Sequence, residues 1–164
     1  MFDVDVEDGH KRYRESETFT AGNEITVLPT PFGTLGLSIC YDVRFPQLYS
    51  QLRRLGAQVI LVPAAFTAVT GKAHWETLLR ARAIETQCWI VAVNQGGMHP
   101  CGRETWGHSM VVNPWGEVVA SLEQETGNLL VEIDLTALET LRASMPVTMH
   151  SRFENQFLEI TSEL

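Results

Sequence analysis

Cys40 is the residue of this chain whose surroundings point most directly to chemistry. It closes the apolar run Gly36-Leu37-Ser38-Ile39, which has the composition of a short strand, and a helical pattern begins at Phe45. A thiol on such a strand-to-helix turn faces the free N–H groups and the partial positive charge of the helix start, which favour the thiolate. The turn therefore predicts a cysteine nucleophile. The alternative is a buried strand thiol without a catalytic role.

Charged residues after Cys40 and in the next helix are further candidates. Asp42 and Arg44 lie two and four residues past Cys40. Arg44 either pairs with Asp42 or holds the carboxylate of a substrate in a bidentate contact. Glu76 lies early in a predicted helix, where the helix dipole favours a glutamate. Its position alone therefore indicates an ordinary surface residue.

His99, Cys101 and His108 are the residues of this chain that could suggest a metal site. Their spacing matches no common zinc pattern, so we expect no metal here. His108 is also an alternative base for Cys40, in a Cys–His pair. No glycine-rich phosphate-binding loop occurs, and Gly96-Gly97 indicates only a turn.

The elements that would position these residues alternate between strands and helices. Short apolar or β-branched runs predict strands, and apolar residues at helical spacing predict helices. In chain order, we expect strands at 25–29 and 35–39, a helix at 45–55, a strand at 58–63, a helix at 73–87 and a strand at 88–93. This alternation is typical of an α/β layer.

The remainder of the chain is hairpin-like and ends in a tail. Strands at 108–112 and 117–122 flank Asn113-Pro114-Trp115-Gly116, whose residue types suit a type I turn. The tail at 145–164 has scattered apolar residues, so we expect it to dock on its own domain or on a partner subunit. Further expected elements are a surface loop at 1–24, a strand at 129–133 and a helix at 135–142.

Composition and charge limit the class of protein. The 164 residues suit one domain, and a net charge of −8 without a basic run argues against a nucleic-acid partner. Three cysteines without a C-x-x-C motif indicate a reducing compartment, so we expect a cytoplasmic protein. No apolar run is long enough to span a membrane, and the acidic start lacks a signal-peptide pattern.

Several segments together resemble the nitrilase superfamily of carbon–nitrogen hydrolases, in particular its Nit branch. They match in both order and spacing, over nearly the whole chain. The segments are Cys40-Tyr41-Asp42-Val43-Arg44-Phe45-Pro46, Pro63-Ala64-Ala65-Phe66-Thr67, Thr70-Gly71-Lys72-Ala73-His74-Trp75-Glu76, Leu79-Arg80-Ala81-Arg82-Ala83-Ile84-Glu85 and Gly107-His108-Ser109-Met110-Val111-Val112-Asn113-Pro114-Trp115-Gly116.

The resemblance implies an α/β fold that is part of a four-layer α-β-β-α sandwich, and a homodimer or higher homo-oligomer that often forms through the tail. Such enzymes use a Glu–Lys–Cys triad without a metal or organic cofactor. Cys40 matches the nucleophile, which forms a thioester with a small carboxylate-bearing amide such as deaminated glutathione. The backbone N–H of Tyr41 matches an oxyanion donor. Glu76 matches a second acidic residue beside the triad.

The chain also departs from the family pattern. The triad Glu and Lys of the family both precede the segment that resembles Phe2-Asp3-Val4-Asp5-Val6. The only lysines here are Lys11 and Lys72, and neither aligns with the triad position. We therefore expect residues 1–164 to form a single truncated domain, equivalent to the C-terminal three-fifths of a family member, with impaired catalysis.

Three hypotheses about function follow from these residues. The first is an amidase in which Cys40 is the nucleophile, Tyr41 an oxyanion donor, Glu76 an auxiliary acid and Arg44 a substrate-binding residue. The second is a non-catalytic remnant or partner-binding module of the same fold. The third is an unrelated Cys–His hydrolase that uses His108.

Overall fold

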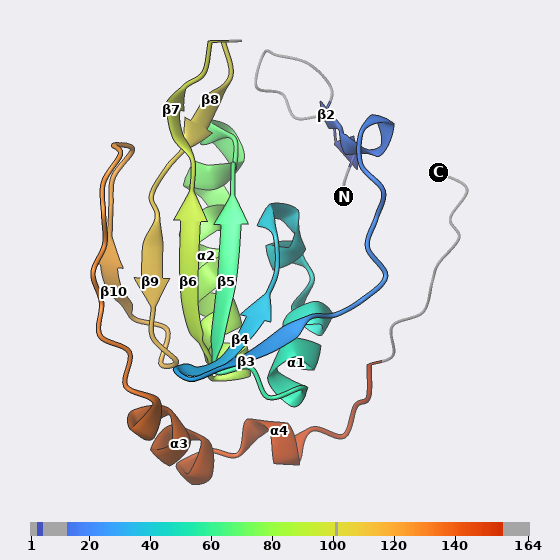
Figure 1. Ribbon diagram of the computed structural model, residues 1–164, viewed down its shortest axis with the longest axis vertical. Coiled ribbons are helices and arrows are strands. Elements are labelled where there is room, and N and C mark those ends of the chain that lie inside the picture. The colour runs from blue at the N-terminus through green and yellow to red at the C-terminus, as the bar shows by residue number, and fades with distance from the viewer. Residues whose placement is uncertain (1–2, 5–12, 101, 156–164) are drawn as a thin grey trace.

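A mixed sheet with helices packed on one face forms the body of the protein. The computed structural model describes residues 3–4, 13–100 and 102–155. Six strands follow the order β10-β9-β6-β5-β4-β3 across the sheet (Figure 1). Their bounds are β3 (Val27–Thr30), β4 (Gly33–Leu37), β5 (Val59–Ala64), β6 (Trp89–Asn94), β9 (Met110–Val112) and β10 (Val118–Ser121).

Helices and short hairpins complete the described elements. The helices are η1 (Glu15–Glu17), η2 (Cys40–Arg44), α1 (Pro46–Arg54), α2 (Ala68–Thr86), α3 (Leu135–Ser144) and α4 (Val147–His150). Two small antiparallel pairs are β1 (Asp3–Val4) with β2 (Tyr13–Arg14), and β7 (Gly96–Met98) with β8 (Glu104–Trp106). Within the described part of the chain, no helix combines the length and the apolar character needed to cross a membrane.

The three central strands determine where the site lies. β4 pairs with β5, and β5 with β6, in parallel register. The carboxyl ends of all three strands therefore meet at one edge of the sheet, which is where ligands bind in open α/β sheets. Cys40 follows β4 at this edge, as the expected strand-to-helix turn requires.

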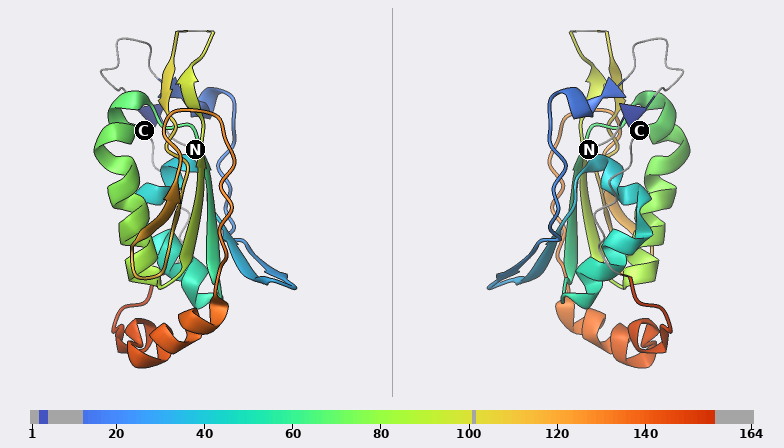
Figure 2. Two further views of the ribbon diagram at one scale, coloured as in Figure 1. Left: turned by 90° about the vertical axis from the view of Figure 1, so that its left-hand side faces the viewer. Right: turned by 90° about the vertical axis from the view of Figure 1, so that its right-hand side faces the viewer.

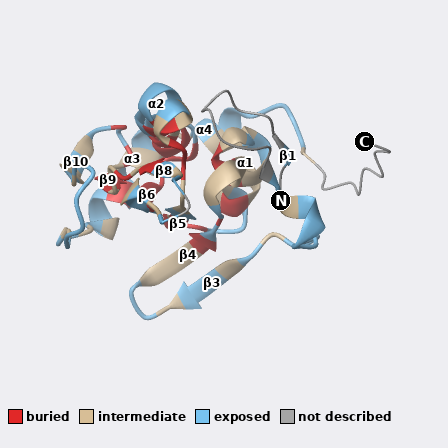
Figure 3. Ribbon diagram, turned by 90° about the horizontal axis from the view of Figure 1, so that it is seen from above, coloured by how far each residue is buried: buried red, intermediate tan, exposed pale blue. Residues whose placement is uncertain are grey.

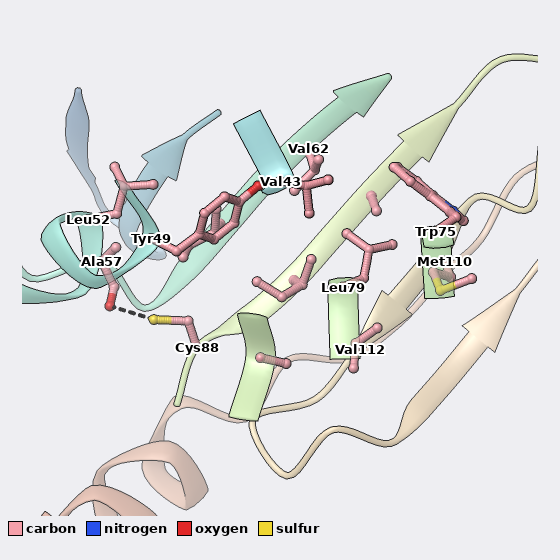
Figure 4. Packing of buried hydrophobic residues seen from close by; sticks show 14 of the residues in the cluster. Val43, Tyr49, Leu52, Ala57, Val62, Trp75, Leu79, Cys88, Met110 and Val112 are labelled. Atoms are coloured by element: carbon pink, nitrogen blue, oxygen red, sulfur yellow. Dashed lines mark hydrogen bonds between the residues drawn. The ribbon is translucent and has the colours of Figure 1, made fainter. Parts of the chain in front are cut away.

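The main core lies between the sheet and the helices on its inner face. Strand residues alternate between the two faces, so Ile60 and Val62 of β5 point inward against the helices. Tyr49 of α1 and Trp75 of α2 are fully buried there (Figure 4). Figure 2 shows α1 and α2 on one side of the sheet, while the β3–β4 hairpin leans away on the other.

The outer face of the sheet has a smaller apolar cluster. Val59, Trp89 and Val111 are buried on it, and the segment 131–135 covers them. This cover does not extend to the carboxyl ends of β4 and β6, where Leu37 is 39% exposed and Val93 is 61% exposed. Figure 3 shows that buried residues concentrate where α2 covers the sheet, whereas β3 is largely exposed. The two faces are thus unequally covered by this chain.

Four sequence-based expectations about elements are wrong. The expected surface loop at 1–24 contains the β1–β2 pair and η1. Residues 129–133 pack Val131 and Ile133 on the outer face, but no described strand pairs with them. α2 begins at Ala68 rather than Ala73, because the Thr67 side chain caps the helix by accepting the Thr70 N–H. Gly96-Gly97 is not an isolated turn, since both residues belong to the β7–β8 hairpin.

The described part of the tail lies along the first helix of the same chain. Arg54 donates from Nη2 to the carbonyl oxygen of Phe153 at 2.6 Å, and Gln51 donates to the carbonyl of Asn155. At its start, the carbonyl of Met145 accepts from Gln87 Nε2 at 2.8 Å. Residues 156–164 of the expected docking tail lie outside the described residues.

We predict that Gly71→Ala destabilises the protein. Gly71 lies inside α2, where alanine is the better helix former by about 1 kcal/mol. A β-carbon at Gly71 would, however, lie only 2.2 Å from Cβ of Trp106. Overpacking of this kind costs about 1–3 kcal/mol, so we expect a net loss in the free energy of unfolding measured by urea denaturation.

Gly22→Ala is the matched control, because a β-carbon at Gly22 meets nothing within 4 Å. It should leave the urea midpoint unchanged. A Gly71→Ala protein as stable as the wild type would contradict the close packing of α2 against β8.

Candidate active site

Cys40 occupies a constrained turn. It opens η2 directly after Ile39, and its φ of 48° lies in the left-handed region. A residue with a side chain adopts this conformation at a cost of about 1–3 kcal/mol. Two hydrogen bonds close the turn: the Ile39 N–H donates to Asp42 Oδ2 at 2.9 Å, and the Asp42 N–H donates to the Ile39 carbonyl at 3.0 Å. Asp42 thus shapes the turn that presents the thiol.

Burial dominates the ionisation of the Cys40 thiol. It raises the pKa of the thiol above its ordinary value, and the Glu15 carboxylate raises this pKa further. Backbone hydrogen bonds from Ala65 and Tyr41, together with the charge of Arg103, act in the opposite direction but do not outweigh burial. The Tyr41 N–H of the turn favours the thiolate, as expected, but burial outweighs it, so the net pKa is raised rather than lowered. At neutral pH, Cys40 must transfer its proton to a base before it can attack.

The loop after β5 approaches the thiol and is braced by Asn94. Asn94 ends β6 and is 5% exposed. Its Oδ1 accepts the Phe66 N–H at 2.9 Å, and its Nδ2 donates to the Gly107 carbonyl at 2.6 Å. Because Phe66 follows Ala65, the side-chain amide of Asn94 fixes the backbone of Ala65, which hydrogen-bonds the Cys40 thiol. Sequence reasoning missed Asn94, since only the order of the strands places it at this edge.

Arg44 is held between two aromatic rings. Its guanidinium carbon lies 5.2 Å from the ring centroid of Tyr41 and 5.2 Å from that of Phe66. Its Nη1 lies 3.3 Å from Nδ1 of His74. Cation–π contacts leave the edge of a guanidinium available for hydrogen bonds, so a role in binding a substrate carboxylate stays a prediction.

The two glutamates considered for the site have different surroundings. Glu76 lies on α2 with a side chain that is 57% exposed, and it pairs with Arg80 at 3.3 Å. The carboxylate that acts electrostatically on the Cys40 thiol is instead that of Glu15, in η1. The site role expected for Glu76 remains untested, and Glu15 is the acidic neighbour that sequence reasoning missed. No spacing signal could reveal Glu15, because it is far from Cys40 in the chain.

His108 makes contacts that do not include Cys40. Its ring stacks on Trp106 with centroids 4.0 Å apart, and its Nε2 lies 3.4 Å from Glu123 Oε2. Among the residues that the structure describes, no three potential metal ligands cluster. Cys101, one of the residues considered for a metal, lies outside the described residues.

Comparisons with known proteins agree with this arrangement. Residues 1–143 match the family described as carbon-nitrogen hydrolase. Deaminated glutathione amidase of Yersinia enterocolitica is 52% identical over 163 residues, which cover 99% of this chain and 57% of that protein. The crystal structure of the Caenorhabditis elegans NitFhit protein superposes with a TM-score of 0.85 and 52% identity, covering 93% of this chain and 37% of that one.

A second similar structure extends the comparison. Saccharomyces cerevisiae Nit3, described as a member of branch 10 of the nitrilase superfamily, has a TM-score of 0.79 and 36% identity. The alignment covers 85% of this chain and 51% of Nit3. The chain therefore belongs to the carbon–nitrogen hydrolase family, and its neighbours include members of the Nit branch. It spans little more than half the length of the Yersinia relative. The expected α/β class and the family resemblance are both confirmed.

We predict that Glu15→Gln makes Cys40 easier to ionise. Because the Glu15 charge raises the pKa of the thiol, neutralising this charge should lower the pKa. The pH dependence of iodoacetamide labelling, followed for the Cys40 peptide by mass spectrometry, should then shift to lower pH. In both proteins Cys40 should react faster than Cys88, which is fully buried and whose pKa burial also raises.

Glu76→Gln is the matched control, since it removes the same charge from an exposed position on α2. Its labelling profile should equal that of the wild type. A shift in Glu76→Gln without one in Glu15→Gln would instead restore Glu76 as the acidic neighbour of the thiol.

Proposed function

We propose that this chain carries the nucleophile of an amidase that hydrolyses small carboxylate-bearing amides, of which deaminated glutathione is an example. The observation that supports this most strongly is the geometry of Cys40, a thiol on a left-handed turn with the backbone of Ala65 and Tyr41 at its sulfur. Membership of the carbon–nitrogen hydrolase family and the names of its relatives support the reaction class.

The proposed reaction has two stages. A base takes the proton of Cys40, and Sγ attacks the amide carbon to form a tetrahedral oxyanion, towards which the N–H of Tyr41 would donate. The C–N bond then breaks, the amine leaves with a proton, and a thioester remains on Cys40. Water hydrolyses the thioester to the carboxylic acid and returns the thiol. The sum is amide plus water giving acid plus amine.

The proposed mechanism needs a base and a cation, which the family triad supplies as Glu and Lys. Lys72 is exposed on α2, and Lys11 lies outside the described residues. We propose that neither replaces the triad lysine, and that catalysis by the 164 residues alone is impaired. A general base contributes about 10²–10⁴ to the rate, and one oxyanion donor about 10²–10³.

Substrate binding and assembly complete the proposal. Arg44 is the group proposed to bind the substrate carboxylate, since its guanidinium is already oriented by Tyr41 and Phe66. Homo-oligomerisation and a cytoplasmic location stay predictions. No cofactor is needed for the proposed steps, because thiol, base and water supply every atom transferred.

We predict slow amide hydrolysis that depends on Cys40. Incubation of the purified chain with deaminated glutathione should release cysteinylglycine, at a rate lowered by about 10² or more because the triad base is not supplied. Cys40→Ala should abolish the release. Mass spectrometry measures the product, and circular dichroism shows that both proteins are folded.

Release that persists in Cys40→Ala would contradict Cys40 as the nucleophile. A rate undiminished relative to a full-length relative would contradict the proposed impairment. Cys88→Ala is the control for loss of a thiol in general, because Cys88 is buried in the core away from the turn.

The second candidate function is that of a partner-binding module without catalysis. The incompletely covered outer face of the sheet favours it, since Leu37 and Val93 are exposed there. Size-exclusion chromatography separates the two outcomes. We predict for a binding module a single assembly of defined mass, whereas heterogeneous aggregates would count against it.

A further inference from the structure

The costly backbone conformation of Cys40 needs surroundings that hold it. A left-handed non-glycine residue persists only where the neighbouring structure over-determines it. The two hydrogen bonds between Ile39 and Asp42 are local to the turn. A further set of contacts reaches the turn from α2 and α1, and it centres on Arg82.

Arg82 contacts the part of the turn that follows Cys40 in the chain. Its side chain is 6% exposed, and its Nε donates to the Val43 carbonyl at 2.8 Å. Val43 belongs to η2 and is itself fully buried (Figure 4). Arg82 therefore ties the backbone of the nucleophile's own 3-10 helix to α2.

The same guanidinium is linked through the ring of Tyr49 to the segment that precedes Cys40. It lies 5.7 Å from the ring centroid of Tyr49 in α1. The hydroxyl of Tyr49 lies 2.8 Å from Oγ of Ser38, and Ser38 Oγ donates to the Leu61 carbonyl at 3.0 Å. Ser38 precedes Cys40 by two residues. The buried contacts of Arg82 thus reach both Ser38, which follows β4, and Val43 in η2.

Glu85 supplies the counter-charge for this buried cation. Its Oε2 accepts from Arg82 Nη1 at 2.8 Å, and its side chain is 48% exposed. A buried guanidinium without a carboxylate partner would be strongly destabilising, so Glu85 makes the position tolerable. The pair leaves Nε free to hold the turn, which is a geometric use of arginine that lysine cannot reproduce.

We propose that Arg82 is a positioning residue for Cys40, fixing the nucleophile's turn at Val43 directly and at Ser38 through Tyr49. The inference depends on the proposed function only in taking Cys40 as the nucleophile. Arg82 touches no reacting atom, so it acts through the backbone that places Sγ against the N–H groups of Ala65 and Tyr41.

The same helix provides a matched control in Arg80. Its Nε also donates to a backbone carbonyl, that of Gly116 at 2.8 Å, and its Nη1 lies 3.3 Å from a glutamate, Glu76. The two arginines thus have the same bonding pattern, but Arg80 reaches the turn between β9 and β10. Arg80→Lys controls for the loss of this bonding pattern on α2, and the Cys88 peptide controls for a loosened core, because the Arg80 side chain is 50% exposed and that of Arg82 only 6%. An effect confined to Cys40 is expected only at Arg82.

The experiment compares Arg82→Lys with Arg80→Lys in the whole chain. Iodoacetamide labelling of the Cys40 and Cys88 peptides is measured across pH by mass spectrometry. In Arg82→Lys, we expect Cys40 to label about fivefold more slowly at neutral pH, the effect of about one lost hydrogen bond, with its profile moved to higher pH. Cys88 labelling should not change. Arg80→Lys should stay within about twofold of the wild type at both cysteines.

A folded Arg82→Lys protein with the wild-type Cys40 profile overturns the proposal. Faster labelling of Cys40 and Cys88 together also overturns it, because that pattern shows only a loosened core. If Arg82→Lys does not fold, Tyr49→Phe decides, since it keeps the ring but removes the hydroxyl from Ser38. The same slowing at Cys40 supports the proposal, and an unchanged profile overturns it. Because labelling needs no amide hydrolysis, these results are independent of whether the chain is an active amidase.

Discussion

The left-handed backbone of Cys40 is the constraint on which the site depends. The chain must leave β4, turn at once and expose a sulfur at the carboxyl edge of three parallel strands. An extended residue there would continue the strand, and a right-handed one would turn the sulfur elsewhere. The surrounding structure provides what this turn requires: Asp42 closes it locally, and Arg82 anchors it to α2. The loop braced by Asn94 then brings the backbone of Ala65 to the thiol.

The ionisation of the thiol shows how burial and hydrogen bonding compete. Removal of solvent from Cys40 penalises the thiolate more than the N–H groups of Ala65 and Tyr41 favour it. The consequence is a thiol that ionises less readily than an ordinary cysteine and that, as the proposed nucleophile, would depend on a base. In the proposed amidase reaction, the proton taken from the thiol would be the one that the leaving amine needs, which would link activation of the thiol to departure of the product.

Local patterns predicted the six strands of the main sheet, the helices α1, α2 and α3 and the position of Cys40, because alternation of apolar runs and the strand-to-helix turn are encoded within a few residues. The start of α2 was misplaced because a single side chain, Thr67, caps the helix ahead of its apolar pattern. Residues 129–133 alternate like a strand, but pairing depends on a neighbour that no local pattern reveals. Glu15, Asn94 and Arg103 could not be found for the same reason, since only the folded chain brings them to the thiol. The raised pKa of Cys40 could not be predicted either, because it results from burial of the thiol in the folded chain.

The conformation of Cys40 also bears on which residues suit position 40. Glycine would adopt this left-handed backbone without steric cost, so the cysteine side chain is present together with backbone strain that glycine would avoid. Gln87 and His108 have the same left-handed backbone, so this angle marks local strain, and it is the thiol that makes position 40 the candidate site.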